Sequence, residues 1–274
     1  LIYASHPIHY HAPIFRHLSK QKQLNTLVMF GDDIGLKEVY SDGFNSKIKW
    51  DIPLTKGYSH FFLKNLAKNK LTGFFSRINF GVFNVINRTD YDFVLVHGYQ
   101  TLTCWLILLC AKIKGIKIIL RGEALIKKDK NLILKLLKFL VIGFYLKNVN
   151  AILYSCKGNY KYWKSFSIDE KKLFFVPCAV DNNFFLRKKS FYKPKINLIK
   201  KELNIAKDDF VIIFPSRFTD RKRPLDLINA VALASRKNIV LLFVGDGPNR
   251  KKMEDLSLQK GVKSIFTGFI NQKL

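Results

Sequence analysis

The chain is poor in cysteine and has no long uninterrupted apolar run. Its four cysteines lie far apart among 274 residues and form no CxxC pair, which argues against a disulfide scaffold and against a zinc ribbon. We therefore expect reduced thiols and a cytoplasmic location. Lysines interrupt the apolar runs well before the roughly 20 residues that a membrane-spanning helix needs, so we expect no integral membrane segment.

Acidic side chains are also scarce, with 20 against 47 lysines and arginines, which gives a net charge of +27. A disordered chain of this charge would lack large apolar residues, whereas this one is 48% hydrophobic and has 24 phenylalanines. The charge is shared between both halves and no nucleic-acid-binding motif accompanies it, so we expect no nucleic-acid partner. A basic nucleic-acid-binding or membrane-surface protein is the non-enzymatic alternative.

Two stretches are more basic than the rest of the chain. Residues 127–172 carry eleven lysines against three acidic residues. Residues 52–89 carry no acidic residue at all and mix cations with aromatic rings, a combination that suits an anionic bilayer surface. We expect this second stretch to form a peripheral face on the inner side of the cytoplasmic membrane. Its members are Lys56, Lys64, Lys68, Lys70, Arg77 and Arg88, with Tyr58, Phe61, Phe62, Phe74, Phe75 and Phe80.

Short apolar runs alternate with helical patterns along the whole chain. The runs show no polar alternation, which is typical of strands buried on both faces of a parallel sheet. Repeated alternation of strand and helix predicts an α/β fold with right-handed crossovers. The predicted strands are 1–5, 26–30, 92–96, 116–120, 151–155, 173–177, 210–215, 239–244 and 263–267, and the predicted helices are 13–22, 102–114, 132–146, 224–236 and 249–260.

A polar, proline-containing stretch over residues 181–208 predicts a linker and a short helix between two sheets. We therefore expect two doubly wound, Rossmann-like domains that face a cleft. The first, residues 1–181, is predicted to bind an acceptor, and the second, residues 182–274, a donor. Ligands of such folds bind at the carboxyl ends of the strands.

The segment that follows the predicted strand 210–215 carries two cations before a helix. Arg217 and Lys222 lie five residues apart, and Pro224 occupies a favoured first-turn position. Cations and free backbone N–H groups at a helix start bind anions, and arginine can hold two phosphate oxygens at once. Taken alone, the segment is equally compatible with a solvated basic loop.

Two further glycine-containing turns favour the anion site. Gly245, Asp246 and Gly247 follow the predicted strand 239–244, where glycine permits a tight turn and close approach of backbone to a ligand. Gly268 and Phe269 end the next predicted strand in the same way. Three successive strands that each end in such a turn predict a binding site at one sheet edge.

These three segments resemble the nucleotide-binding domain of the retaining glycosyltransferases of family 4, which have the two-domain GT-B fold. The resemblance extends over most of the chain and is most specific from residue 173 onward. It is carried by residues 210–225, 239–249 and 261–270, by the junction 176–185, and, for the acceptor half of bacterial members, by residues 6–15, 50–54 and 57–58.

The resemblance implies a nucleoside diphosphate sugar as donor substrate, with no metal and no other cofactor. It implies that Arg217 and Lys222 bind the diphosphate and stabilise it as leaving group, and that Ser216, Gly245, Asp246, Gly247, Gly268 and Phe269 complete the donor site. The family also has two acidic residues seven apart that hold sugar and ribose; this motif is expected within a few tens of residues after Gly268, and the sequence stops at Leu274. We therefore expect a sequence truncated at both ends and a fragment without normal turnover.

In the first domain, His9, His97 and Glu123 are candidates for contact with acceptor or sugar. His97 and Glu123 each follow a predicted strand. Glu123 is equally compatible with a structural ion pair to Arg121. The cluster of His6, His9 and His11 has no cysteine or carboxylate at ligand spacing, so an acceptor-binding loop is favoured over a zinc site.

The predicted activity is transfer of a hexosyl group, with retention, to a lipid-linked or polysaccharide acceptor, as in cell-surface polysaccharide synthesis. The enzymatic alternative is a nucleotide-sugar epimerase of the same fold, which would alter the sugar without an acceptor.

Overall fold

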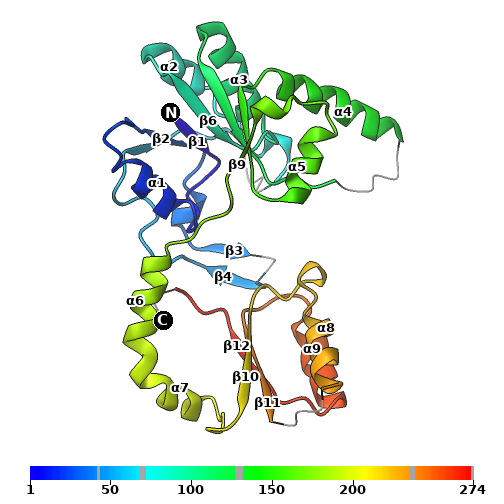
Figure 1. Cartoon of the computed structure of the whole chain (residues 1–274). Helices are drawn as coiled ribbons and strands as arrows, with labels where there is room; N and C mark the ends of the chain where they lie inside the picture. The colour runs from blue at the N-terminus through cyan, green and yellow to red at the C-terminus, as the bar shows by residue number, and fades with distance from the viewer. Residues whose placement is uncertain (42–43, 68–71, 127–131, 235–237, 273–274) are drawn as a thin grey trace. The chain divides into compact units, whose positions relative to one another are not determined.

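The computed structural model describes residues 1–41, 44–67, 72–126, 132–234 and 238–272 (Figure 1). The chain divides into two compact units. The first comprises Leu1–Leu36 with Pro53–Val180, and the second comprises Lys37–Ile52 with Asp181–Leu274. The division at residues 180 and 181 lies one residue from the expected domain boundary. Residues 37–52, which we assigned to the first domain from the sequence, belong to the second unit.

The first unit is built on a seven-stranded sheet in the order β5-β2-β1-β6-β7-β8-β9. All neighbouring strands in this sheet are parallel. Their carboxyl ends therefore meet at one edge, where ligands bind in such folds. The strands are β1 (Ile2–Ala4), β2 (Val28–Phe30), β5 (His60–Phe62), β6 (Phe93–His97), β7 (Lys117–Arg121), β8 (Ala151–Tyr154) and β9 (Leu173–Phe175).

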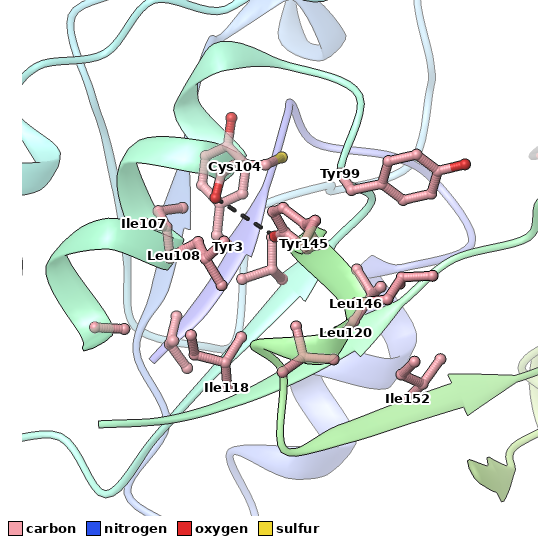
Figure 2. Packing of buried hydrophobic residues seen from close by; sticks show 14 of the residues in the cluster. Tyr3, Tyr99, Cys104, Ile107, Leu108, Ile118, Leu120, Tyr145, Leu146 and Ile152 are labelled. Atoms are coloured by element: carbon pink, nitrogen blue, oxygen red, sulfur yellow. Dashed lines mark hydrogen bonds between the residues drawn. The ribbon is translucent and has the colours of Figure 1, made fainter. Parts of the chain in front are cut away.

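Helices cover both faces of this sheet. Successive strand residues point to opposite faces, and in β1 the side chains of Ile2 and Ala4 pack with Phe15 of α1. Tyr3 packs on the opposite side in the larger core cluster (Figure 2), which includes Ile107 of α3. This arrangement confirms the predicted doubly wound α/β fold. The helices are α1 (Ala12–Leu18), α2 (Val82–Arg88), α3 (Leu102–Lys114), α4 (Leu132–Lys147) and α5 (Lys157–Lys164).

The second unit contains a parallel sheet with strand order β10-β11-β12. Strands β10 and β11 pair in continuous register over six residues. Its core joins Phe243 of β11 to Ile228 of α8 and Met253 of α9. An antiparallel hairpin of β3 and β4 comes from the first fifth of the chain. The elements are β3 (Val39–Ser41), β4 (Ser46–Ile48), α6 (Asn182–Tyr192), α7 (Ile196–Glu202), β10 (Phe210–Pro215), α8 (Pro224–Ala232), β11 (Ile239–Val244), α9 (Arg250–Gln259) and β12 (Ser264–Gly268).

Two members of the basic aromatic stretch 52–89 are buried and do not lie on the membrane-facing surface that we expected. Arg77 is only 3% exposed, and its Nε lies 3.8 Å from Oδ2 of Asp32. Tyr58 is buried as well. Both side chains are therefore buried inside the first unit. The composition of the stretch could not reveal this burial. Lys68 and Lys70 lie outside the described residues.

In the part of the chain that the structure describes, no helix is both long and apolar enough to cross a bilayer.

Candidate functional site

The loop after β10 places the two predicted phosphate-binding cations at the carboxyl edge of the second sheet. Ser216 N–H donates to Val244 O at 3.0 Å, which ties the start of the loop to β11. The ring of Phe218 is fully buried and anchors the centre. Arg217 and Lys222, on either side of this anchor, are exposed, and neither has an ion pair with a described residue. Their charges are therefore available to an anion.

The turn after β11 packs directly against that loop. Gly245 has φ of +143°, and a Cβ there would lie 2.0 Å from Ser216 O. Gly247 has φ of +155°, and its Cβ would lie 2.8 Å from the backbone of Phe218. Phe218 N–H donates to Asp246 O at 2.9 Å, which joins the two loops. Glycine is thus required at both positions, because the backbone of the turn lies too close to the backbone of the loop after β10 for any Cβ.

The end of β12 joins the same group. Gly245 N–H donates to Gly268 O at 2.8 Å. Hydrogen bonds therefore connect the loop after β10, the turn after β11 and the end of β12, and the structure brings together Ser216, Gly245, Asp246, Gly247 and Gly268, with Phe269 next in the chain.

The Asp246 side chain is engaged within the protein. Its Oδ2 lies 2.8 Å from Nη1 of Arg250, and its Oδ1 accepts from Gly247 N–H at 2.7 Å. Arg250 in turn donates from Nε to Glu254 at 2.9 Å, and these two carboxylates raise its pKa. Asp246 thus joins the loop after β11 to Arg250, the first residue of α9.

The β3–β4 hairpin supplies aromatic neighbours that the sequence analysis missed. The guanidinium carbon of Arg217 lies 4.8 Å from the ring centroid of Phe44. Phe269 meets Phe44 edge-on at 5.0 Å and Trp50 at 5.9 Å between centroids. Asn271 Nδ2 also donates to Lys49 O at 2.6 Å. Because these partners are separated by more than 170 positions, the only signal in the sequence was the aromatic character of the segment 44–50.

A second group of polar residues lies at the carboxyl edge of the first sheet. His11 follows β1 and His97 ends β6, and their ring centroids are 4.5 Å apart. Burial lowers the pKa of His97 to about 3 and that of His11 to about 4, so both rings are neutral at pH 7. His11 Nδ1 is buried and has no hydrogen-bond partner among the described residues. His9 lies in the loop between β1 and α1 and acts electrostatically on His11.

Glu123 is joined to Arg121 and to the end of the first unit. Arg121 Nη2 lies 3.6 Å from Glu123 Oε1, so the ion pair considered from the sequence is present. Arg121 also donates to the carbonyl of Val176, and Cys178 Sγ donates to Glu123 at 3.3 Å. The Glu123 side chain stays more than half exposed. Within the described residues, no three histidine, cysteine, aspartate or glutamate side chains lie together as metal ligands.

Comparison with known proteins finds one family match, which lies within the second unit. The family described as "Glycosyl transferases group 1" matches residues 195–274. A stretch of 83 residues is 35% identical to an uncharacterized glycosyltransferase of Methanocaldococcus jannaschii, covering 29% of this chain and 21% of that protein. The chain thus spans about a fifth of the length of that curated relative.

Solved structures resemble nearly the whole chain. HepE of Anabaena in complex with UDP matches 98% of this chain and 69% of its own, with a TM-score of 0.67 at 13% identity. A glycosyltransferase of Rickettsia africae matches 98% and 68%, with a TM-score of 0.66 at 14% identity. The UDP-GlcNAc 2-epimerase of Neisseria meningitidis matches 98% of this chain and 72% of its own, with a TM-score of 0.52 at 15% identity. These likenesses confirm the predicted fold, which GT-B glycosyltransferases and epimerases share.

The matched segment, residues 195–274, contains every residue that we predicted for the donor. Its loops leave Arg217 and Lys222 exposed while the backbones around them are fixed by hydrogen bonds and by buried Phe218. Such preorganised cations bind an anion with little loss of conformational freedom. The predicted acceptor residues all lie outside this matched segment, in the first unit.

Proposed function

We propose that the chain belongs to a retaining glycosyltransferase that moves a hexosyl group from a nucleoside diphosphate sugar to a lipid-linked or polysaccharide acceptor. The observation that carries the proposal is the set of three hydrogen-bonded strand ends, together with two exposed cations that form no ion pair with a described residue, all within the segment that matches the group 1 family. The UDP in the complex of Anabaena HepE, whose fold is similar, supports a nucleoside diphosphate as ligand.

In the proposed reaction, Arg217 and Lys222 hold the diphosphate. The bond between the anomeric carbon and the phosphate oxygen breaks, and its electron pair passes to the diphosphate. The acceptor oxygen forms the new bond to the anomeric carbon, and its proton passes to the departing diphosphate oxygen. Negative charge grows on the leaving group, so fixed cations stabilise the transition state more than the ground state. The proposal assigns this stabilisation to the two side chains and not to a metal, so a chelator should leave turnover unchanged.

Ser216, Gly245, Asp246, Gly247, Gly268 and Phe269 are proposed as donor-binding residues through their backbone and its rigidity. His9, His97 and Glu123 are proposed for the acceptor or sugar. The neutral rings of His97 and His11, with the unsatisfied Nδ1 of His11, can bind sugar hydroxyl groups. The location proposed is the cytoplasm, at the inner face of the membrane; its four free cysteines are compatible with a reducing compartment.

Calorimetry tests the diphosphate site directly. We expect UDP to bind more tightly than UMP and uridine not to bind, since affinity follows the number of phosphates. Arg217→Ala and Lys222→Ala should each weaken UDP binding about tenfold or more, while Arg221→Ala, in the same exposed turn, serves as matched control. Wild-type affinity in both site variants, with unchanged circular dichroism, would contradict the proposal.

Product analysis separates the enzymatic alternatives. An epimerase would release an altered sugar without any acceptor, whereas a transferase needs the acceptor and, if retaining, preserves the anomeric configuration seen by NMR. Strong salt-dependent binding to duplex nucleic acid with no UDP binding would favour a nucleic-acid-binding protein.

A further inference from the structure

Helix α4 turns a continuous apolar face to the solvent. Leu132 and Ile133 at its start are 77% and 72% exposed, and Phe144 near its end is 61% exposed. Exposed apolar residues recur every three or four positions, so they line one side of the helix over several turns. We call this set the apolar face of α4; its members are Ile133, Leu136, Leu137, Leu140, Val141 and Phe144.

This face is not the side by which α4 packs on the first unit. Tyr145 and Leu146 are fully buried in the core beside Cys104 (Figure 2). The Tyr145 ring meets Trp105 at 5.0 Å between centroids, and Tyr145 OH donates to Cys104 O at 3.4 Å. The helix is therefore held through its opposite side, and the apolar face is presented on a fixed support.

Scattered single apolar side chains on a surface need no explanation, but a continuous row of them marks an interaction site. The row on α4 has a second property, the absence of acidic charge. Residues 131–168, which include α4 and α5, contain six lysines and no aspartate or glutamate. Among these, Lys147 is exposed at the last position of α4.

An apolar helix face in a segment whose only charged residues are lysines matches the two chemistries of an anionic bilayer surface. Apolar side chains enter the boundary between headgroups and acyl chains, and each lysine near the surface adds attraction to anionic lipid. A water-soluble partner would need an apolar groove with acidic charge beside it. An anionic bilayer has an apolar interior and negative headgroups over its whole surface. At 16 residues, α4 has a length of about 24 Å and lies along a surface without crossing it.

We propose that the apolar face of α4 docks the first unit onto an anionic lipid bilayer, with the helix lying in the interface plane. The proposal can be tested separately from the donor site, because UDP binding is measured without lipid and vesicle binding is measured without UDP.

Vesicle flotation tests the proposal. We expect the wild-type chain to float with vesicles of phosphatidylcholine mixed with phosphatidylglycerol and to remain with the soluble fraction when phosphatidylcholine is used alone. The triple variant Leu136→Ser, Leu140→Ser, Phe144→Ser should lose binding by about tenfold or more, since each side chain gives up apolar contact with lipid. Leu233→Ser with Leu258→Ser is the matched control, because both residues are more than 80% exposed in the second unit.

A second measurement keeps the proposal testable if the triple variant fails to fold. Leu140→Trp adds a fluorophore to the face, and its emission should shift to shorter wavelength and be quenched by brominated anionic lipid, whereas Leu233→Trp should not respond. Equal flotation of the triple variant and the wild type, no quenching at position 140, or equal binding to vesicles without anionic lipid would each overturn the proposal. Absence of vesicle binding, with a dimer that the triple variant dissociates, would instead assign the face to a second copy of the chain.

Discussion

Replacement of Gly245 by alanine tests whether the three strand ends form one mechanically coupled site. The added Cβ would lie 2.0 Å from Ser216 O, so the loop after β10 must move by about 1 Å. That movement breaks the hydrogen bonds of Ser216 N–H to Val244 O and of Gly245 N–H to Gly268 O. Two lost hydrogen bonds cost roughly 2 kcal/mol, and the backbone conformation at φ of +143° costs alanine about 1–3 kcal/mol.

The expected total is about 3–5 kcal/mol in the free energy of opening the second unit. Gly261→Ala is the matched control, because Gly261 also has a positive φ, of +62°, but no atom lies within 4 Å of its would-be Cβ. Alanine there carries only the backbone cost, about 1–2 kcal/mol. The difference of about 2–3 kcal/mol corresponds to a roughly 30- to 150-fold faster exchange.

Hydrogen exchange of the β10 and β11 amides measures this difference locally, without assuming that both units unfold together. We expect these amides to exchange much faster in Gly245→Ala than in Gly261→Ala, and UDP binding to be lost only in the former. Equal exchange rates in the two variants would refute the reasoning, because the close contact with Ser216 would then have no energetic consequence.

Two further predictions concern single side chains. Phe44→Leu removes the ring from beside Arg217 but keeps an apolar side chain. Since an exposed cation–π contact contributes about 0.5–1 kcal/mol, calorimetry should show UDP affinity lowered about two- to fivefold. Trp50→Leu removes the ring that meets Phe269 and should retain more of the affinity. The pKa of His97 lies at about 3 when folded, below its ordinary 6.5, so the unfolded chain binds an additional proton between these values and stability falls as the pH drops below 6.5. His97→Phe should remove about 3 kcal/mol of the loss between pH 7 and pH 4, measured by urea unfolding with fluorescence of the first unit; an unchanged pH dependence would show that His97 is not buried in its neutral form.

Elements with strong local signals were predicted closely. The bounds of β10, β11 and α3 agree with the sequence-based ranges, because continuous apolar runs and a helical period extend over their whole lengths. Strands β3, β4 and β5 were missed because none of them lies in an apolar run of four residues, such as the runs that indicated the equally short strands β1 and β2. The stretch 181–208 was expected to hold a linker and one short helix, and it forms α6 and α7 with a short 3-10 turn between them.

The residues of the candidate site likewise fall into those that the sequence predicted and those that it did not. Residues within one strand-turn-helix segment, such as Arg217 and Gly245, could be placed together because parallel strands end at one edge. Phe44 could not, since its contact with Arg217 joins parts of the chain far apart in sequence and depends on packing that no local pattern encodes. The burial of Arg77 was missed for a similar reason: its partners Asp32 and the carbonyl of Ser5 lie on other elements.

The membership of residues 37–52 in the second unit has a practical consequence for dividing this protein into pieces. The chain passes between the units three times, near residues 36, 52 and 180. A donor domain expressed from residue 181 onward would leave Phe44 and Trp50 behind, together with the carbonyl of Lys49 that Asn271 binds. Domain exchange between relatives at that single junction would likewise pair one parent's hairpin with the other parent's strand ends. A functional chimera should therefore transfer residues 37–52 together with the C-terminal segment.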